Sequence, residues 1–166
     1  MREFNEITRP AGTAEWAQEH RKLYLQSGGT HGHIMDITGA GGYPFGTHCL
    51  IRYKGRKSGR TMITGLCYGD IGGEVVICAS KGGAPESPQW YHNIRAAETV
   101  DFQIATQAFR ATWREPEGDE REKVWDFMAD CFPFYNQYQQ RTDREIPLLM
   151  MKAVEPLAVF SVADLD

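Results

Sequence analysis

The sequence predicts a β-rich α+β fold, a small antiparallel barrel with peripheral helices. Six or so strand-like runs, joined mostly by short turns, occupy the middle and the end of the chain. Helical spacing is confined to segments outside those runs, and strands and helices do not alternate regularly, which disfavours a Rossmann fold. A length of 166 residues, 42% of them hydrophobic, suits one compact domain that needs no disulfide bonds.

Residues 1–46 are predicted to form a helix and a glycine-rich connector ahead of the barrel, which takes residues 47–166. Thr13 to Gln26 has helical spacing, and Gly28-Gly29 directly beyond it favours termination of the helix. The connector from Gly28 to Gly46 is either mobile or ordered over a ligand. One face of the expected helix carries Trp16, His20, Leu23 and Tyr24.

Three strands are expected next, at Thr47–Tyr53, Thr61–Tyr68 and Glu74–Ala79, because these runs are rich in β-branched and apolar residues. A basic turn joins the first two, and Gly69-Asp70-Ile71-Gly72-Gly73 joins the second to the third. In an antiparallel meander, strand ends two steps apart can lie on the same edge of the sheet. The basic turn and the loop after the third strand are therefore expected to face one ligand.

The second half of the chain is predicted to hold a hairpin, a final strand and three helical segments. Pro88 and Asp119 are placed to begin helices, and Pro133 is placed to end one. The strands are expected at Val100–Ile104, Phe109–Glu115 and Ile146–Val154, and the helices at Gln89–Ala97, Asp119–Cys131 and Tyr135–Gln140.

Composition narrows the classes of partner. A net charge of -4 and a sequence pI near 5.7 give no support to a nucleic-acid or membrane-surface partner. Met1 to Glu6 is polar, with no apolar segment after it, and no later stretch is long enough to span a bilayer, so neither a signal peptide nor a transmembrane segment is expected. Four cysteines without metal or redox spacing indicate a reducing, cytoplasmic location. They are Cys49, Cys67, Cys78 and Cys131.

Two loops pair basic side chains with small residues, a combination typical of anion sites built partly from backbone N–H groups. In the first, Gly55 to Arg60, Arg56 stands where a Walker A loop has glycine, so a P-loop is excluded. The second, Ser80-Lys81-Gly82-Gly83, follows directly on a strand, and its glycines permit close approach of a ligand. Each alone is explained as a charged or flexible loop. Together, on an acidic chain, they predict a site for a phosphorylated ligand.

Aromatic residues suggest where a flat ring would bind. Trp90 and Asn93 lie on one face of a short predicted helix, where Trp90 is either a core residue or a cofactor contact. A second group surrounds Pro133 and is either packing or an apolar wall with phenolic hydroxyls for hydrogen bonds. Its members are Phe132, Phe134, Tyr135 and Tyr138.

Two further clusters receive a structural interpretation. Arg141-Thr142-Asp143-Arg144 is expected to pair within itself and to fix the last strand. His31, His33 and Asp36 lie in a glycine-rich segment without a further well-spaced ligand, so no metal site is predicted. No hydrolase nucleophile motif is present in the sequence.

Four blocks, by their order and separation, resemble the nitroreductase family of deazaflavin-dependent oxidoreductases. They are Gly55 to Gly59, Ser80 to Gly83, Trp90-Tyr91-His92-Asn93 and Arg141 to Pro147, and the similarity runs from about Leu50 to Pro156. The resemblance implies a split β-barrel that binds coenzyme F420, a deazaflavin with a phosphate and an anionic oligoglutamate tail. It also implies hydride transfer from the reduced coenzyme to quinones, activated alkenes or nitro-heterocycles.

By the same resemblance, individual residues receive roles in binding and catalysis. The phosphate would be held by Arg56, Lys57, Ser58 and Gly59, with Arg60 near the acidic tail. The deazaflavin and its linker would be lined by Cys67, Cys78, Ala79, Ser80, Lys81, Gly82 and Gly83, backed by Trp90 and Asn93. Tyr135 and Tyr138 match aromatic residues that cover the substrate pocket. The chain departs from the family at Cys67 and Phe132, where tyrosine is frequent, and at Met62, where a basic residue is common.

The sequence therefore predicts an F420-dependent reductase acting on an apolar small molecule, with Ser80, Tyr135 and Tyr138 as candidate catalytic residues. Orientation and desolvation of the acceptor would supply most of the rate enhancement. Two alternatives stay open, a flavin mononucleotide enzyme on the same barrel and a non-catalytic F420 carrier. The sequence names neither the acceptor nor the oligomeric state.

Overall fold

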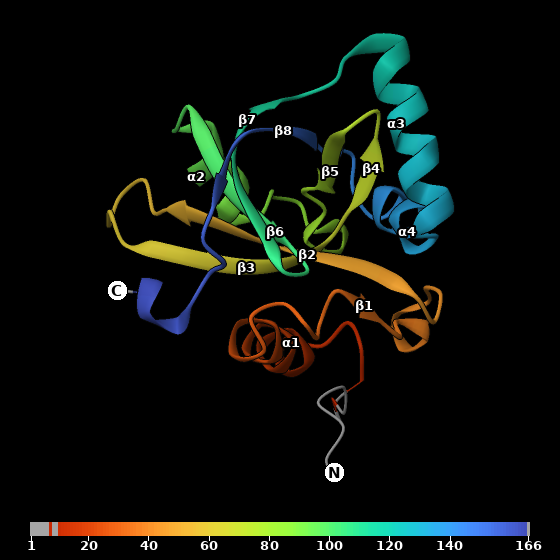
Figure 1. Ribbon diagram of the computed structural model, residues 1–166. Coiled ribbons are helices and arrows are strands. Elements are labelled where there is room, and N and C mark those ends of the chain that lie inside the picture. Colours follow the sequence, from red (N-terminus) through yellow and green to blue (C-terminus); the bar gives the residue numbers. More distant parts are fainter. Residues whose placement is uncertain (1–6, 8–9, 166) are drawn as a thin grey trace.

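The computed structural model describes Ile7 and residues 10–165; Met1 to Glu6, on which the expectation about a signal peptide partly rests, lie outside the described residues. An eight-stranded antiparallel sheet forms the centre of the molecule (Figure 1), in the order β1-β2-β6-β7-β8-β5-β4, with β3 on the other edge of β2. No ladder joins β3 to β4 or β5 in the described chain, so the sheet curls without closing. This β-rich α+β architecture confirms the predicted fold class.

Six strands lie close to the expected positions, and the described residues add two short ones, at Ile34–Met35 in the connector and at Gly69–Ile71. The turn predicted at residues 69–73 is itself a short hairpin, because Gly69, Asp70 and Ile71 pair with the following strand. The last strand passes through Pro156, which pairs with Phe109 beside a bulge. The strands are β1 (Ile34–Met35), β2 (Gly46–Lys54), β3 (Thr61–Cys67), β4 (Gly69–Ile71), β5 (Glu74–Cys78), β6 (Thr99–Ile104), β7 (Gln107–Arg114) and β8 (Leu148–Leu157).

The order of the strands differs from the meander that the sequence analysis assumed. Strand β5 pairs with β4 and β8, and β3 pairs with β2 alone. The three expected strands are therefore not consecutive in the sheet. Pairing between segments far apart in the chain overrides sequence order because it buries both faces of β5 and of Leu148 to Met151 in β8.

Four helices surround the sheet. The Thr13 hydroxyl caps α1 by accepting the N–H of Trp16 at 3.2 Å. The third helix begins at Gly118, so Asp119 lies in its first turn and is not its cap. The helices are α1 (Ala14–Gln26), α2 (Gln89–Arg95), α3 (Gly118–Cys131) and α4 (Phe134–Gln140), with 3₁₀ turns η1 (Thr38–Ala40), η2 (Lys81–Gly83) and η3 (Val162–Asp164).

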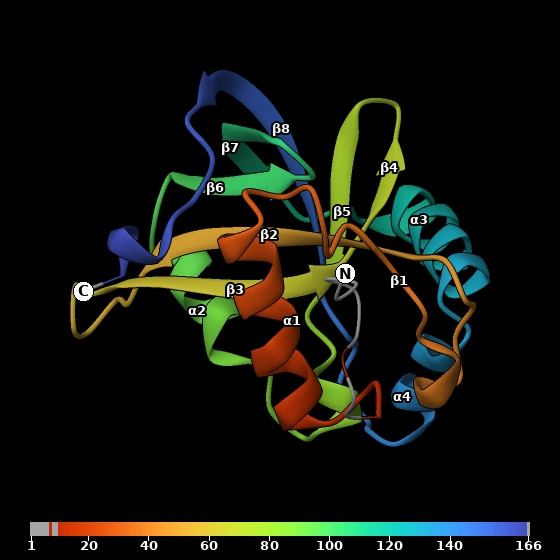
Figure 2. The same cartoon turned by 60° about the horizontal axis from the view of Figure 1, so that its bottom comes forward.

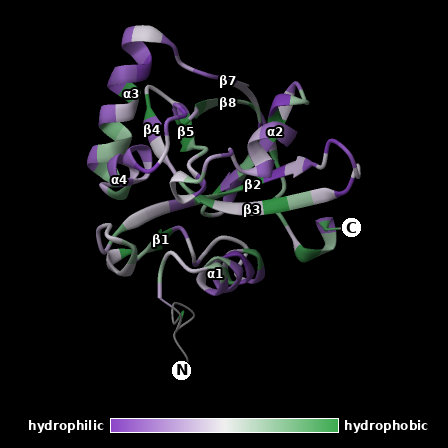
Figure 3. Ribbon diagram, turned by 180° about the vertical axis from the view of Figure 1, so that it is seen from behind, coloured by the Kyte–Doolittle hydropathy of each residue, from purple (hydrophilic) through white to green (hydrophobic). Residues whose placement is uncertain are grey.

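The helices enclose one end of the sheet. Helix α1 lies across β2 and β3 on one side, α2 lies on the other side, and α3 and α4 stand beside β4 and β5 (Figures 1 and 2). Helix α3 is hydrophilic in its first turns and carries hydrophobic residues further along (Figure 3), where Val124 and Met128 are buried. A single buried cluster joins residues of α1, β5, β8, α3 and α4. Within the described residues, no helix has the length and apolar character to cross a membrane.

Candidate functional site

A cavity of about 340 Å³ opens where α1, the connector, β3, β5, α2 and α4 meet. Its volume lies within the range of small-molecule sites, and its wall is largely apolar and aromatic. The residues proposed from the sequence that line it are Cys67, Cys78, Ser80, Lys81, Gly82, Trp90, Tyr135 and Tyr138. Phe134, expected as either packing or an apolar wall, also lines it, and the main lining residues that sequence reasoning missed are Trp16, Ala17, Ile37, His48 and Leu66.

The loop after β5 is held in place by Arg144. Its guanidinium donates to the carbonyl oxygens of Ala84 at 2.8 Å, Ala79 at 3.2 Å and Ser80 at 2.7 Å, and to the Ser87 hydroxyl at 3.1 Å. The planar fork of arginine suits such a set of convergent acceptors. Arg144 is structural, as expected, but its partners lie in the loop that carries Ser80 and not in its own segment.

Helix α4 braces the same loop from the side. Gly83 has a φ of 84°, and a Cβ at this position would come within 2.4 Å of the Tyr138 carbonyl oxygen. Only glycine permits this approach of η2 to α4. Arg141 adds a hydrogen bond of 3.2 Å to the Gly82 carbonyl, while its guanidinium lies over the Tyr138 ring. The loop is therefore fixed by contacts that the spacing of its own residues does not reveal.

Two polar groups of this loop remain available to a ligand. The Ser80 side chain lies at the cavity, and no described residue is its hydrogen-bond partner. The Lys81 ammonium pairs with Glu86 at 2.8 Å, but both side chains are exposed. Exposed ion pairs contribute little free energy, so an anionic ligand can displace Glu86.

The basic turn between β2 and β3 projects into solvent. Arg56, Lys57 and Arg60 are exposed, and none of the ion pairs recorded for the described residues involves them. Arg56 donates its backbone N–H and Nη1 to Asn93 Oδ1 at 3.1 and 2.8 Å, and Nη2 to Gln89 Oε1 at 3.0 Å. These partners are neutral, so the three positive charges of the turn are not compensated by them.

Helix α2 connects the turn to the cavity. Asn93 holds Arg56, and Trp90, three residues earlier on the same helix, lines the cavity beside the Ser80 loop. The turn itself does not line the cavity. The registers place the ends of β2 and β5, and with them both predicted loops, at the same edge of the sheet, as expected, and α2 links the two loops. Asn93 and Ala79 are buried, so their contribution is to support the site from behind.

The two tyrosines of α4 differ in their surroundings. Tyr135 is 5% exposed, and its hydroxyl lies beside Cys78, at the end of β5. Burial raises the pKa values of both groups, so they are un-ionised at neutral pH. Tyr138 is only half-buried, and no described residue hydrogen-bonds its hydroxyl. Of the two, Tyr138 is the better placed to reach a ligand.

Helix α1 supplies a wall of the cavity, a role that the sequence did not indicate. Trp16 lines the cavity and stacks on His20, with ring centroids 4.8 Å apart and planes inclined by 10°. His20 is fixed by Gly32, whose carbonyl lies 2.8 Å from Nε2, and contacts the His48 ring at 4.7 Å. The i, i+4 spacing of Trp16 and His20 predicts a shared face. What that face covers is decided by the tertiary structure.

The three residues considered as metal ligands, His31, His33 and Asp36, each contact a different partner. His33 Nε2 lies 2.6 Å from the Tyr68 hydroxyl, and Asp36 accepts the backbone N–H of Thr38 at 3.0 Å. His31 lies beside the Thr30 hydroxyl. No group of three metal-ligating side chains is present in the described part of the chain.

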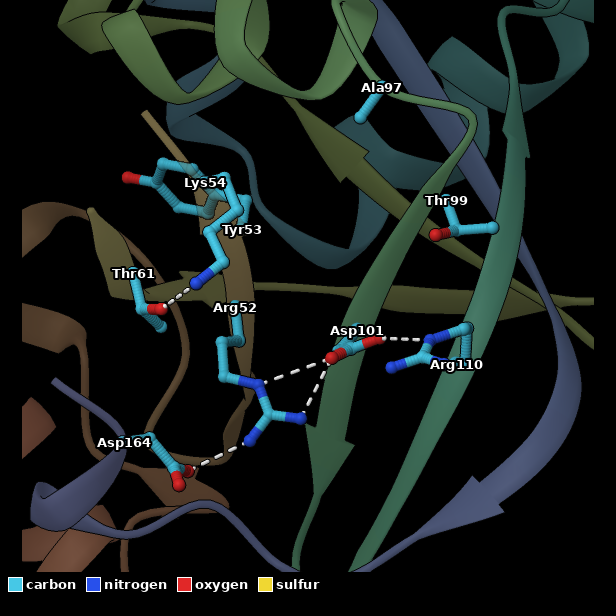
Figure 4. A pocket seen from close by; sticks show the side chains of 9 residues that line it. All are labelled: Arg52, Tyr53, Lys54, Thr61, Ala97, Thr99, Asp101, Arg110 and Asp164. Carbon is cyan, nitrogen blue, oxygen red and sulfur yellow. Dashed lines mark hydrogen bonds and ion pairs between the residues drawn. The ribbon is translucent and has the colours of Figure 1, made fainter. Parts of the chain in front are cut away.

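A second hollow, of about 490 Å³, lies near the C-terminal segment and is lined by ion pairs (Figure 4). Arg52 bridges Asp101 and Asp164, each at 2.8 Å, and Asp101 also accepts from Arg110 at 3.2 Å. These charges are paired with one another, and the ion pairs join the C-terminal segment to β2 and β6. The hollow therefore offers a ligand less unpaired charge than the basic turn does.

The donor set fits coenzyme F420. A deazaflavin needs an apolar slot with hydrogen-bonding groups, and its phosphate and acidic tail need uncompensated cations. The aromatic cavity with Ser80 supplies the first, and the exposed turn with Arg56, Lys57 and Arg60 supplies the second.

Comparison with known proteins agrees with this fit. Residues 16–153 match the family model for the F420H(2)-dependent quinone reductase. The F420H(2)-dependent quinone reductase Rv1261c of Mycobacterium tuberculosis is 31% identical over 135 residues, which cover 80% of this chain and 86% of that protein. The solved structure of an F420-H2 dependent reductase (FDR-A) is 37% identical with a TM-score of 0.59, over 63% of this chain and 93% of the other. A structure described as a domain-swapped dimer is 34% identical with a TM-score of 0.62, over 83% of this chain and 98% of the other.

These matches confirm the family resemblance and the predicted cofactor, and they favour F420 over flavin mononucleotide. The match includes α1, whose Trp16 lines the cavity, as well as both loops around α2. The chain belongs to the F420H(2)-dependent quinone reductase family.

Proposed function

We propose that the chain catalyses the reduction of a quinone-type small molecule by reduced F420 in the cavity beside Ser80. The observation that carries this proposal is the arrangement around α2. One helix contributes Trp90 to an aromatic cavity and holds, through Asn93, a turn with three uncompensated cations. An aromatic slot next to a cationic cradle suits a flat redox ring that carries an anionic tail.

Each part of the site has a separate task. Arg56, Lys57, Ser58 and Gly59 bind the phosphate, and Arg60 attracts the acidic tail. Ser80 to Gly82, with Cys67, Cys78 and Trp90, line the ring, while Ala79, Gly83 and Asn93 support that wall. When bound, the reduced cofactor supplies a hydride, which favours two-electron chemistry.

Side chains of the cavity orient and activate the acceptor. The Ser80 and Tyr138 hydroxyls can donate hydrogen bonds to an acceptor carbonyl, on which negative charge develops during reduction. The aromatic wall excludes water, which strengthens such hydrogen bonds. Tyr135 positions the wall through Cys78. The proton that completes the product comes from solvent at the mouth of the cavity.

Quinones are the preferred acceptors because relatives of this chain are named as quinone reductases and the cavity is lined largely by apolar and aromatic side chains. Activated alkenes and nitro-heterocycles are the next candidates. A non-catalytic F420 carrier would leave Ser80 and Tyr138 without a task. A cytoplasmic location is part of this proposal, in accord with the un-ionised free thiols.

Anaerobic turnover tests the proposal. Reduced F420 and a catalytic amount of the protein are mixed with menadione, an enone or a nitroarene, and the appearance of oxidised F420 is followed by absorbance. Rapid turnover with menadione is the expected result. Tight binding of F420 without turnover of any acceptor would support the carrier, and turnover with reduced flavin mononucleotide alone would support the flavin enzyme.

A further inference from the structure

His48 is a buried polar residue of the cavity wall to which the proposed reaction assigns no task. It lies on β2, lines the cavity and is 3% exposed. Its ring is flanked by His20 at 4.7 Å and by Trp16 at 5.6 Å, measured between ring centroids. Buried polar side chains in an apolar wall are costly unless they are hydrogen-bonded, so the partners of His48 indicate what the position can do.

One ring nitrogen has a fixed role. His48 Nδ1 lies 2.8 Å from the Gly46 carbonyl oxygen, which can only accept a hydrogen bond. Nδ1 therefore carries the proton. Burial, together with the neighbouring His20, lowers the pKa of His48 to about 3, so the ring is neutral at physiological pH. In this tautomer Nε2 has a lone pair and accepts hydrogen bonds.

The partner of that lone pair is a weak one. Nε2 lies 3.4 Å from Cys67 Sγ, across the β2–β3 pair, where the two residues are directly opposite. Burial raises the pKa of the Cys67 thiol to about 12, so the thiol is protonated and can donate. Thiols are weak donors compared with hydroxyls. A ligand hydroxyl that reaches Nε2 therefore forms the better hydrogen bond.

Hydrogen-bond direction then distinguishes the ligands. A quinone carbonyl has no hydrogen to donate, whereas a hydroquinone or another hydroxyaromatic ring does. Ser80 and Tyr138 can donate to a carbonyl, and His48 in its neutral tautomer can only accept at Nε2. The cavity thus has groups complementary to both oxidation levels of a quinone.

We propose that His48 Nε2 is a specificity-determining acceptor that binds a ring hydroxyl of the ligand, so that the cavity selects hydroxyaromatic molecules. The hydroquinone product of the proposed reaction belongs to this class, and to that extent the inference rests on the proposed function. The occupant is defined by chemistry: a flat aromatic ring with a hydroxyl that reaches Nε2 in place of the Cys67 thiol.

Two matched ligands test the proposal without turnover. 1-Naphthol donates a hydrogen bond, and 1-methoxynaphthalene, with a similar ring, does not; both are uncharged at neutral pH. Their binding to the protein is followed by quenching of tryptophan fluorescence, since Trp16 and Trp90 line the cavity. The wild type should bind 1-naphthol about five- to tenfold more tightly, the range expected for one neutral hydrogen bond.

Two substitutions at position 48 separate recognition from packing. In His48→Gln the side-chain oxygen lies near the former Nε2 and can still accept. In His48→Asn the amide can still donate to the Gly46 carbonyl, but no acceptor reaches the Nε2 position. The preference for 1-naphthol should persist in the first variant and disappear in the second. If the preference is instead kept in His48→Asn and lost in His48→Gln, it depends on the hydrogen bond to Gly46. That result would overturn the proposal and leave His48 as a structural residue.

A third variant covers the case in which substitution of His48 prevents folding. Cys67→Ala removes the competing thiol, so the preference for 1-naphthol should increase by about two- to fivefold. An unchanged or smaller preference would contradict the proposal. His33→Asn is the matched control, because His33 bonds Tyr68 and does not line the cavity; it should keep the wild-type preference.

The naphthalene binding test does not depend on turnover, so it can be judged separately from the proposed function. Failure of the wild type to oxidise reduced F420, with the 1-naphthol preference intact, overturns the proposed function and leaves the His48 assignment standing. Equal affinity of the wild type for the two naphthalenes overturns the His48 assignment, whatever the turnover shows.

Discussion

The guanidinium of Arg144 donates a hydrogen bond of 2.7 Å to the backbone carbonyl of Ser80, 64 positions earlier in the chain. Three further hydrogen bonds from the same group reach Ala79, Ala84 and Ser87. The connection between α4 and β8 thus sets the position of the loop that borders the cavity. Arg144 thus controls the geometry of a loop that lies far from it in the sequence.

Arg144→Lys should weaken F420 binding about tenfold, because lysine keeps the positive charge but cannot donate all four hydrogen bonds that hold the loop. Fluorescence titration with F420 measures the effect. Arg110→Lys is the control, since Arg110 also makes hydrogen bonds, to Asp101 at 3.2 Å and Glu155 at 3.0 Å, but lies on β7 and does not line the cavity. If Arg144→Lys lowers thermal stability and leaves the F420 affinity of the folded protein unchanged, the positioning role is contradicted.

Lys57→Ala should weaken F420 binding about tenfold at low salt, because it removes one charge-assisted contact of the exposed turn. The difference should shrink as salt rises, since screening weakens this contact in the wild type as well. Lys152→Ala, an exposed lysine of β8, changes the net charge equally and serves as the control. Equal affinity of Lys57→Ala and wild type at low salt would contradict the anion site.

The protein should bind F420 at least tenfold more tightly than flavin mononucleotide, because Arg60 and its neighbours can meet an acidic tail that the flavin lacks. Calorimetry with both cofactors measures the ratio. Arg60→Ala should reduce the ratio by lowering the F420 affinity alone. Comparable affinities in the wild type would favour the flavin enzyme.

The two tyrosines of α4 should respond differently to removal of the hydroxyl. Tyr138→Phe should reduce turnover of menadione about ten- to a hundredfold with little change in stability, as expected for one lost polar contact in a transition state. Tyr135→Phe should lower the free energy of unfolding by about 1 kcal/mol, because it removes the polar contact of a buried hydroxyl with Cys78. Steady-state rates per folded molecule, combined with urea unfolding, distinguish the two. The reverse pattern would make Tyr135 the ligand contact.

Acid should destabilise the fold through the buried histidines. The pKa of His48 is about 3 in the folded state, and that of His20 is also lowered. Between about pH 6.5 and 3 the unfolded chain therefore binds more protons, and the free energy of unfolding falls as the pH falls. From pH 7 to 5 the loss should reach about 2 kcal/mol for His48. Urea unfolding at both pH values should show a smaller loss in His48→Gln, and an equal loss in both proteins would contradict the shifted pKa.

The sequence by itself determined the local elements of this protein. The helix from Thr13 to Gln26, the hairpin near residues 99–114 and the turn around Arg56 follow from periodicity, caps and turn residues, which act over a few positions. The two basic loops likewise predicted a site for a phosphorylated ligand, because their chemistry is local, and the family resemblance of the four blocks implied the cofactor.

The tertiary structure alone decided which of those elements meet. Local periodicity gives no information about distant partners, so the placement of β5 between β4 and β8 could not be predicted. Trp16 and His48 carry no motif, and they border the cavity only because α1 packs across β2 and β3. Long-range pairing and burial, not local preference, thus placed the cavity wall, because the free energy gained by burying these rings depends on what lies across from them.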